Sequence, residues 1–484
     1  MDPKNLLIII SDEHNPKTLG CYGHPLVQTP HLDRIAASGV RFSKAYCNSP
    51  VCIPARAVIA TGRYINQIGF WDNADPYDGS VRSWHHRLRE AGHRVVSIGK
   101  LHFRSTEDDN GFSEEIVPMH VIEGKGDLMG LVREELPRRG SSWKMAGMAG
   151  PGESPYTFYD RDITARAQVW LREQAKLYSD KPWVLFVSLV CPHFPLTAPP
   201  EHFYRYYDDP KLPWPKLYDR DERPNHPYLK EYGSSFAYDE HFESPDLVRR
   251  GVAGYLGLCS FLDENVGKIV NALNESGLAD ETRIMYMSDH GDNLGARGVW
   301  GKSTMYEESV AVPWILAGSD IPVGREIGVP VSHVDLYPTI VESVGLELTP
   351  EECSFPGRSL STFFTDPIDR FVFSEYHGMG STGGIFMIRD SRYKYIHYVN
   401  HPPELFDLEK DSEELRNLCG VSEYQHIKDR CEAKLRSVCN PEEVERRAKQ
   451  RQAEQLERHG GREAVIARGD LGFSPPPGIS AEFS

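Results

Sequence analysis

The sequence lacks any C-x-x-C pair, and its nine cysteines are scattered along 484 residues. This pattern excludes a zinc ribbon and argues against a disulfide framework. No apolar stretch approaches the ~18 residues needed to span a bilayer. The apolar run at residues 6–10 is too short for the core of a signal peptide. We therefore expect a reduced, cytoplasmic, enzyme-sized protein with no membrane partner.

Basic residues are fewer than acidic ones: the chain has 54 Lys and Arg and 70 Asp and Glu, which give a formal net charge of −16. An acidic balance argues against nucleic acid or an anionic membrane as the main partner, since both reward clustered positive charge. A single basic pocket can still bind a small anionic substrate. The sequence also contains no P-loop and no H-E-x-x-H motif.

Four short apolar runs each end abruptly in reactive side chains. Continuous apolar runs of this kind are typical of strands buried on both faces of a parallel sheet. Helical patterns alternate with them at residues 31–38, 80–91 and 246–273. The alternation predicts an α/β fold with a mostly parallel central sheet flanked by helices, in which ligands bind beyond the carboxyl ends of the strands. The four predicted strands are residues 6–10, 94–98, 183–190 and 283–288.

The pattern changes at Phe371, where three strands (371–375, 385–389 and 393–399) predict a smaller C-terminal subdomain with an antiparallel sheet. We therefore divide the chain into a catalytic domain (1–370), this subdomain (371–440) and a charged helix with a tail (441–484). The last segment has too little apolar content to fold alone. We expect it to dock on a neighbouring copy in a homo-oligomer, a dimer or a tetramer.

Two long segments, about 104–160 and 200–245, look like loops that serve as lids or substrate walls. The aromatic residues of 203–238 could surround a quaternary ammonium group, but we favour a role in the core of a lid. Residues 378–383 fit G-x-G-x-x-G. They lead into a predicted strand, so the helix N-terminus that a dinucleotide site needs is missing. We interpret them as a flexible loop.

The segment around Cys52 is the most informative part of the chain. Pro54 is a plausible first helical residue and Gly62 a plausible terminator, so Cys52 is expected at a helix N-terminus. The exposed N–H groups and the dipole of a helix favour an anion there. Arg56 lies one turn further on and can reach the same space.

Cys52 to Arg56 spell C-x-P-x-R, and Thr61-Gly62-Arg63 continue the pattern. The chain resembles the formylglycine-dependent sulfatases of the alkaline phosphatase superfamily, near arylsulfatases, choline sulfatases and phosphonate monoester hydrolases. Matching segments cover roughly residues 5–65, 93–103, 183–200, 280–315 and 385–418. The resemblance implies an alkaline-phosphatase-like fold. It also implies that a formylglycine-generating enzyme converts Cys52 to an aldehyde, whose hydrate supplies a metal-bound hydroxyl nucleophile.

Three carboxylates follow buried strands and would be forced to protonate without a cation, whereas a hard divalent ion with oxygen ligands resolves their repulsion. The resemblance implies a set of metal ligands formed by Asp12, Glu13, Cys52 (as the hydrated aldehyde), Asp289 and His290. Glu13 and His290 depart from the Asp and Asn that are common in the family. We expect Ca²⁺, with Mn²⁺ or Mg²⁺ as alternatives, because imidazole suits transition metals.

Positively charged and titratable residues also match family positions, and fixed cations around a transferred anion lower its barrier. We expect His193 to protonate the leaving oxygen and His102 to deprotonate the geminal hydroxyl during sulfate release. Asn73 matches an amide that contacts substrate or nucleophile. The expected clamps on the sulfate oxygens are Arg56, Lys100 and Lys302.

The sequence thus predicts a sulfuric ester hydrolase that acts on a small, anionic sulfate monoester. The closest alternative keeps the nucleophile but acts on phosphonate monoesters or phosphodiesters, and Glu13 and His290 favour it. Lys100 and His102 favour the sulfatase, because sulfate-ester hydrolases carry this Lys-x-His pair. A third hypothesis is a non-catalytic binding protein or an enzyme that uses the unmodified thiol.

Overall fold

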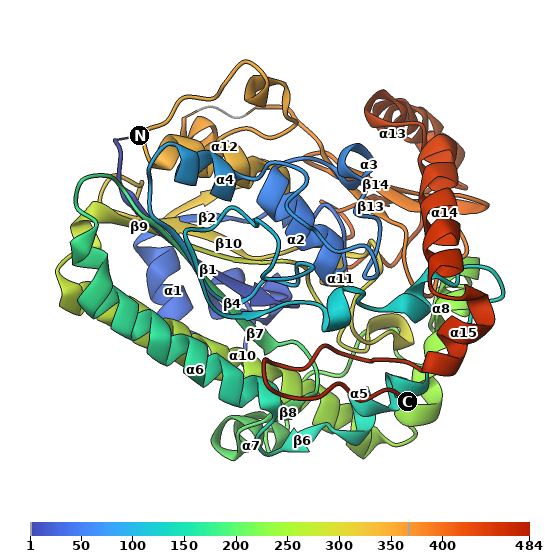
Figure 1. The fold of residues 1–484 in the computed structure, drawn as a ribbon. Coiled ribbons are helices and arrows are strands. Elements are labelled where there is room, and N and C mark those ends of the chain that lie inside the picture. The colour runs from blue at the N-terminus through green and yellow to red at the C-terminus, as the bar shows by residue number, and fades with distance from the viewer. Residues whose placement is uncertain (1, 366–367) are drawn as a thin grey trace.

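A mixed sheet of eight strands forms the centre of the molecule in a computed structural model that describes residues 2–365 and 368–484 (Figure 1). Its middle strands β9, β1, β7 and β4 are parallel neighbours and correspond to the four predicted strands. The α/β prediction with a mostly parallel sheet is therefore confirmed. The strands in sheet order are β11 (Arg325–Ile327), β2 (Gly39–Phe42), β10 (Trp314–Ala317), β9 (Thr282–Ser288), β1 (Asn5–Asp12), β7 (Val184–Pro192), β4 (Val95–Lys100) and β5 (Glu114–Met119).

The middle strand β1 explains why the predicted strands are continuously apolar. Ile8 pairs with Phe186 of β7 on one side and with Met285 of β9 on the other. Leu6 to Ile10 are all fully buried. Both faces of this strand are covered, so no position along it can be polar without a partner.

The strands on the β11 side escaped prediction because they are short. β2 and β10 have four residues each and β11 has three. β10 runs antiparallel to β9 and to β2, which makes this part of the sheet mixed. Runs of this length carry too little periodicity to be recognised.

Helices cover both faces of the sheet (Figure 1). On one face, α6 (Pro155–Val169) and the long α10 (Pro245–Ser276) pack on β7 and on each other, with α1 (Pro30–Ala37) beside α10. On the other face lie α2 (Cys52–Thr61), α4 (Trp84–Glu90) and α12 (Leu336–Ser343). The start of α10 is fixed by Ser244, whose side chain accepts from the N–H of Leu247, and by the following proline.

The two segments expected as long loops contain regular structure. The first includes β5, the short α5 (Lys144–Gly147) and the beginning of α6. The second includes α7 (Pro200–Tyr207), α8 (Pro227–Phe236) and α9 (Tyr238–His241). Proline is the first residue of α7 and α8, where its missing N–H costs nothing. Pro200 and Pro227 thus begin helices within a segment that was expected to be a loop.

The C-terminal antiparallel sheet has four strands, one more than predicted: β13 (Val372–Tyr376), β14 (Ile385–Arg389), β15 (Tyr393–Tyr398) and β16 (His401–Asp407). β16 was not predicted because Pro402 and Pro403 argue against a strand in the sequence. β16 is an edge strand, which tolerates proline. The G-x-G-x-x-G segment leads into β14 and not into a helix, as expected.

The C-terminal segment packs on its own chain. Helices α13 (Gln425–Val438), α14 (Pro441–Arg458) and α15 (Gly461–Arg468) line one side of the molecule, and the tail after α15 runs back beneath the sheet (Figure 1). On α14, Glu445 pairs with buried Arg133 and Gln452 donates to Asp72. The segment therefore compensates for its low apolar content within the chain, contrary to the expected docking on a neighbour. The homo-oligomer stays a prediction.

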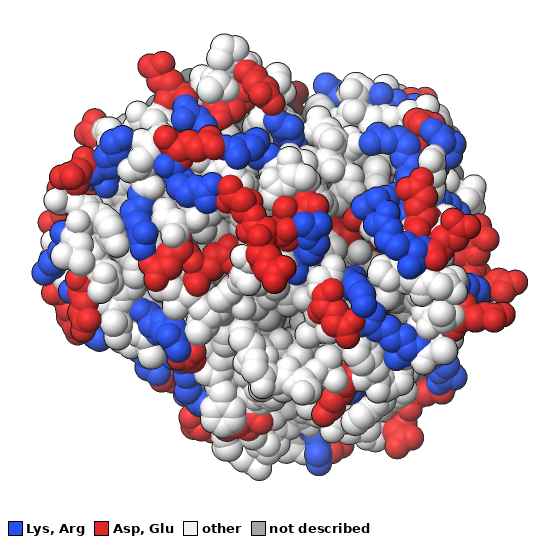
Figure 2. Space-filling view, viewed as in Figure 1, with Lys and Arg blue, Asp and Glu red and all other residues white. Residues whose placement is uncertain are grey.

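Charges of both signs intermingle over most of the face seen in Figure 2, and the lower part of this face carries few of them. Within the described residues, every helix is too short or too polar to cross a lipid bilayer.

We expect Ile8→Ala to destabilise the protein by about 2–5 kcal/mol, because it leaves a cavity at the centre of the sheet. The matched control is Val323→Ala, since Val323 is 71% exposed and should change the free energy of unfolding by less than about 0.5 kcal/mol. Urea denaturation followed by circular dichroism measures both variants. Equal losses in the two variants would contradict the central position of β1.

Candidate functional site

The four neighbouring parallel strands deliver the reactive side chains to one edge of the sheet. Each strand ends at or just before residues that the sequence singled out, and all of these residues are buried. Because parallel strands end at the same edge, side chains from distant parts of the sequence meet there. They are Asp12 and Glu13 after β1, Asp289 and His290 after β9, Lys100 and His102 after β4, and His193 after β7.

Helix α2 brings Cys52 to the same place. The helix begins at Cys52, two residues before the predicted start, and ends at Gly62, which adopts the left-handed conformation. Arg56, one turn later, donates to Asp12 Oδ2 at 3.1 Å and to Asp289 Oδ2 at 2.9 Å. Its Nη1 donates to the Lys100 carbonyl at 2.7 Å. All three guanidinium nitrogens are thus engaged by the protein.

Asp12, Cys52, Asp289 and His290 form a buried cluster whose potential ligand atoms all lie within 4.8 Å of one another. Cys52 Sγ lies 3.6 Å from Asp12 Oδ1 and 3.2 Å from His290 Nε2. His290 Nε2 lies 3.7 Å from Asp289 Oδ1. Two carboxylate oxygens and an imidazole nitrogen facing one point are a donor set suited to a divalent cation. The residues present therefore fit the expected metal.

The orientation of His290 is fixed by its second ring nitrogen. Nδ1 lies 2.9 Å from the carbonyl oxygen of Gly291. A carbonyl can only accept, so Nδ1 carries the proton and the lone pair of Nε2 faces the cluster. Protein ligands to metals are commonly oriented by such a contact.

The charge of Asp12 is balanced by cations on its other side. Burial alone would raise its pKa, but Lys100, Arg56 and Lys302 outweigh burial and hold the pKa of Asp12 well below its usual value. The closest of these contacts joins Lys100 Nζ to Asp12 Oδ2 at 2.5 Å. Asp12 is consequently ionised and ready to bind a cation.

Glu13 lies at the border of the cluster and not inside it. Its Oε2 accepts from Lys302 Nζ at 3.0 Å and lies 3.3 Å from His193 Nε2. Its Oε1 is buried and has no partner among the described residues. Glu13, Asp12 and His193 form a second group that could hold a metal ion. The predicted ligands therefore fall into two adjoining groups that share Asp12.

Asp292 is an acidic neighbour of Glu13 that the sequence did not single out as a site residue. Burial, assisted by Asp292 and opposed by Lys302, raises the pKa of Glu13 to about 8. Burial also raises the pKa of Asp292 to about 6. Two buried carboxyl groups this close disfavour each other's ionisation, so the pair retains a proton near neutral pH.

His193 and Lys302 form a hydrogen-bonded pair. The Nδ1 atom of His193 donates to the Phe194 carbonyl at 2.6 Å, so the lone pair of Nε2 accepts from Lys302 Nζ at 2.7 Å. Burial and the Lys302 charge hold the pKa of His193 well below its usual value. His193 is thus neutral, and the positive charge of the pair lies on Lys302.

His102 and Asn73 complete the predicted set. Both ring nitrogens of His102 are buried without a partner in the described residues. Burial, with Lys100 and Arg56 nearby, holds the pKa of His102 well below its usual value, so the ring is neutral and can accept a proton. Asn73 Oδ1 accepts from the Ile53 N–H at 3.2 Å, at the start of α2.

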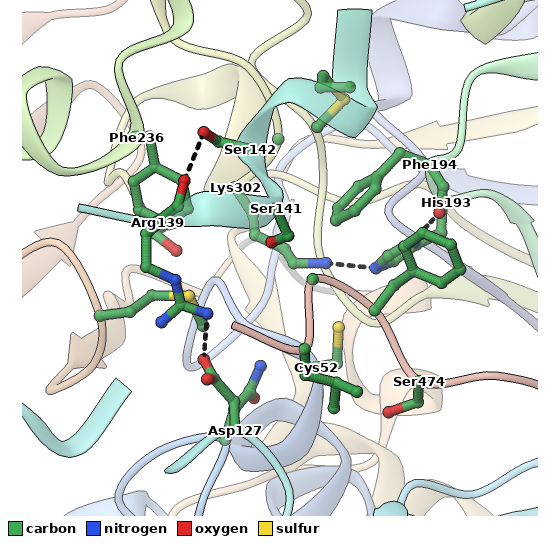
Figure 3. A pocket seen from close by; sticks show the side chains of 18 of the residues that line it. Cys52, Asp127, Arg139, Ser141, Ser142, His193, Phe194, Phe236, Lys302 and Ser474 are labelled. Carbon is green, nitrogen blue, oxygen red and sulfur yellow. Dashed lines mark hydrogen bonds and ion pairs between the residues drawn. The ribbon is translucent and has the colours of Figure 1, made fainter. Parts of the chain in front are cut away.

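Five of the predicted site residues line one cavity (Figure 3). The cavity has a volume of about 80 Å³, which suits a small ligand. Cys52, Asn73, His102, His193 and Lys302 line it. Aromatic side chains make up much of the remaining wall: Tyr156, Phe194, Tyr232, Phe236, Tyr238 and Phe473.

Sequence reasoning placed the two long segments near the substrate but did not identify the wall residues. Asp127 and Arg139 come from the first segment, and Tyr232, Phe236 and Tyr238 from the second. These aromatic residues line the cavity and do not merely form the core of a lid. The tail contributes residues 471–474, for which the sequence held no signal beyond an absence of core-forming residues.

Comparisons with known proteins agree with this geometry. Residues 4–346 match the family model described as Sulfatase, and residues 295–440 match one described as N-sulphoglucosamine sulphohydrolase, C-terminal. A choline-sulfatase of Rhizobium meliloti (strain 1021) is 30% identical over 428 residues, which cover 86% of this chain and 82% of the relative. Arylsulfatase K of Danio rerio is 28% identical over 467 residues, covering 90% and 84%.

Solved structures show the same fold. A structure described as a complex with its substrate D-glucosamine-2-N,6-O-disulfate has a TM-score of 0.71 and 24% identity, and the match covers 93% of this chain and 99% of that one. The phosphonate monoester hydrolase of Agrobacterium radiobacter has a TM-score of 0.70 and 22% identity, covering 90% and 95%.

We predict that the affinity for Ca²⁺ rises as the pH is raised towards about 8 and then levels off. The pKa of Glu13 is about 8, so below that value an ion must displace a proton to use this carboxylate. Displacement of one proton changes the apparent dissociation constant by about tenfold per pH unit. Isothermal titration calorimetry from about pH 6 to pH 9 measures this slope. Glu13→Gln should remove it, and a slope that is unchanged in this variant would exclude Glu13 as a ligand.

Proposed function

Because the chain belongs to the sulfatase family and is therefore a sulfatase, we propose that it hydrolyses a small sulfate monoester with Cys52, converted to formylglycine, as the nucleophile. One observation carries the proposal: Cys52 starts a helix in a buried cavity, between a cluster suited to a cation and the Lys302–His193 pair. Negative charge on a transferred sulfate would meet positive groups on both sides.

The state of the Cys52 thiol supports its conversion. Burial and the charge of Asp12 raise the pKa of Cys52 to about 12. The unmodified thiol is therefore neutral at physiological pH, and a neutral thiol is a poor nucleophile. Conversion to the aldehyde replaces it with a hydrate, one hydroxyl of which attacks sulfur while the other later expels the sulfate. We propose a formylglycine-generating enzyme as the partner that makes this change.

The proposed metal ligands are Asp12, Asp289, His290 and residue 52, with Glu13 of the adjoining group as a further candidate. When bound, a divalent ion would act as a Lewis acid on oxygen atoms placed beside it. Ca²⁺ fits the carboxylates, and Mn²⁺ or Mg²⁺ are the alternatives because His290 supplies nitrogen. Arg56 was expected to clamp sulfate oxygens. Its contacts with Asp12 and Asp289 favour a positioning role, in which it holds two ligands in place.

The remaining residues supply charge and protons. In this proposal Lys302, which lines the cavity, stabilises the peripheral oxygens of the sulfate group. Lys100 adds its positive charge from its position beside Asp12, outside the cavity lining. Lys302 Nζ holds the proton of the resting Lys302–His193 pair. Transfer of this proton to His193 Nε2 makes His193 the general acid that delivers it to the leaving oxygen. Neutral His102 is the base that removes a proton from residue 52 when sulfate departs. Asn73 orients the substrate beside the start of α2.

A second candidate activity is hydrolysis of phosphonate monoesters. Glu13 and His290 depart from the usual sulfatase ligands, and similarity to the phosphonate monoester hydrolase structure concerns the fold alone. Lys100 and His102 favour the sulfatase. The choline-sulfatase relative raises a quaternary ammonium substrate as an alternative, for which the aromatic wall offers cation–π contacts. The Arg139 guanidinium in the same wall opposes a cation there.

Two further features remain proposals. The nine cysteines all lie in the described residues and none of them forms a disulfide, which is typical of a reducing compartment and supports a cytoplasmic location. Self-association would have to use surfaces other than the inner face of the C-terminal tail, because that face packs on its own chain.

We predict that an aryl sulfate is hydrolysed with a kcat/KM at least tenfold above that of the matching aryl phosphonate monoester. The expectation rests on the Lys100 and His102 pair, which lies beside the nucleophile. Parallel steady-state assays with the same phenol as leaving group make the comparison independent of that group. A preference for the phosphonate would replace the sulfatase with the alternative.

We expect Cys52→Ala to abolish turnover, because alanine has no heteroatom from which the aldehyde can form. Cys52→Ser should lose most of the turnover, because the proposed generating enzyme acts on the cysteine thiol. Thermal unfolding should change little in the serine variant, which keeps the size of the side chain. Peptide mass spectrometry across residue 52 of the wild type should detect the aldehyde in proportion to activity. Full activity in a sample that contains only the free thiol would refute the mechanism.

A further inference from the structure

The Arg139 side chain lies in the cavity wall with unused hydrogen-bonding capacity. Arg139 is 5% exposed, and its Nε and Nη1 atoms are buried without a hydrogen-bond partner in the described part of the chain. Only Nη2 is engaged, donating to Asp127 Oδ2 at 2.9 Å and to Asp470 Oδ1. Unsatisfied donors of a buried guanidinium cost free energy. The two unpaired donors of Arg139 therefore indicate that a ligand with a hydrogen-bond acceptor binds beside them.

Arg139 is separated from the reacting groups by the width of the cavity. Figure 3 shows Arg139 and Asp127 on one side and His193 with Phe194 on the other, with Cys52 nearer to the latter. A sulfate group bound at Cys52 and Lys302 would therefore direct its alcohol part towards Arg139. The stacked rings of Phe236 and Tyr232, whose centroids are 4.5 Å apart, form the wall next to the guanidinium.

The local charge favours an uncharged acceptor over an anion. Arg139 contacts two carboxylates, Asp127 and Asp470, which already outnumber its single positive charge. A second anionic group on the substrate would meet their repulsion, whereas a hydroxyl or ether oxygen accepts from Nε or Nη1 without adding charge. A cationic group on the substrate would be repelled by the positive charge of the guanidinium.

The C-terminal tail holds Arg139 in this orientation. Asp470 is fully buried and accepts from the Ser141 N–H at 2.9 Å as well as from Arg139. The backbones of Asp470 and Ser484 exchange two hydrogen bonds of 2.8 and 3.0 Å. Tyr156 donates to the Ser474 carbonyl at 2.6 Å. The tail is thus anchored on both sides of the stretch that lines the cavity.

From these contacts we propose that Arg139, oriented by Asp470 of the C-terminal tail, is a specificity-determining residue that binds an uncharged oxygen acceptor on the alcohol part of the substrate. This inference rests on the proposed sulfatase function, to which it adds the chemistry of the leaving group. It makes the tail a functional part of the site, because loss of Asp470 frees the guanidinium to turn towards Asp127 alone.

The test compares linear alkyl sulfates, from ethyl to hexyl, with the same esters carrying a terminal hydroxyl, a terminal carboxylate or a trimethylammonium group. At the chain length that reaches Arg139, the hydroxyl should raise kcat/KM by about tenfold or more, since a hydrogen bond to a charged donor is among the stronger ones. Preference for the carboxylate or for the ammonium compound would overturn the assignment, as would equal rates for alkyl and hydroxyalkyl esters.

Variants separate this subsite from the sulfatase function. Arg139→Met should bring the ratio of hydroxyalkyl to alkyl turnover to about one, and Asp470→Asn should lower the ratio in the same direction. Arg138→Met is the matched control, because exposed Arg138 pairs with Glu240 at the surface, and it should keep the wild-type ratio. A ratio that survives in Arg139→Met refutes the subsite.

If a variant fails to fold, the substrate series on the wild-type protein still tests whether the cavity prefers an uncharged oxygen acceptor. Failure of the wild type to cleave any of the sulfate esters, together with cleavage of an aryl phosphonate monoester, would instead refute the proposed function.

Discussion

The site depends on the pairing of buried carboxylates with fixed cations. Asp12 and Asp289 have no access to solvent, and both are held by the Arg56 guanidinium. Lys100 adds a second positive charge on Asp12. Without these partners burial would favour the protonated form of Asp12. With them, each carboxylate keeps one oxygen for Arg56 and turns the other towards Cys52 and His290.

This constraint explains why the sheet and helix α2 meet as they do. The carboxylates come from the ends of β1 and β9, and the guanidinium comes from the second turn of α2. Only a helix that starts at Cys52 puts the nucleophile and Arg56 on either side of the same carboxylates. The same ion pairs therefore position two of the proposed metal ligands beside the proposed nucleophile. In the proposed mechanism, Lys302 and His193 then define where the sulfate and the leaving oxygen lie.

Much of the fold and of the reacting centre could be predicted from the sequence, because local pattern and chemistry coincide there. The run from Leu6 to Ile10 is apolar since both faces of β1 are covered, and the acids that follow can only lie at the strand end. Strand β16 was missed because its prolines are tolerated only at an edge. Arg139 and Asp470 could not be found, since they are 331 residues apart and meet through the path of the tail. The hydrophobic periodicity of a sequence does not predict such a long-range contact.

The most direct test of the central claim is a crystal structure of the active enzyme with anomalous diffraction data, grown with the divalent ion that supports turnover. The account predicts one anomalous peak enclosed by Asp12, Asp289, His290 and residue 52, and electron density for an aldehyde or its hydrate at residue 52. An active crystal with no peak at that position, or with an unmodified thiol at residue 52, would contradict it.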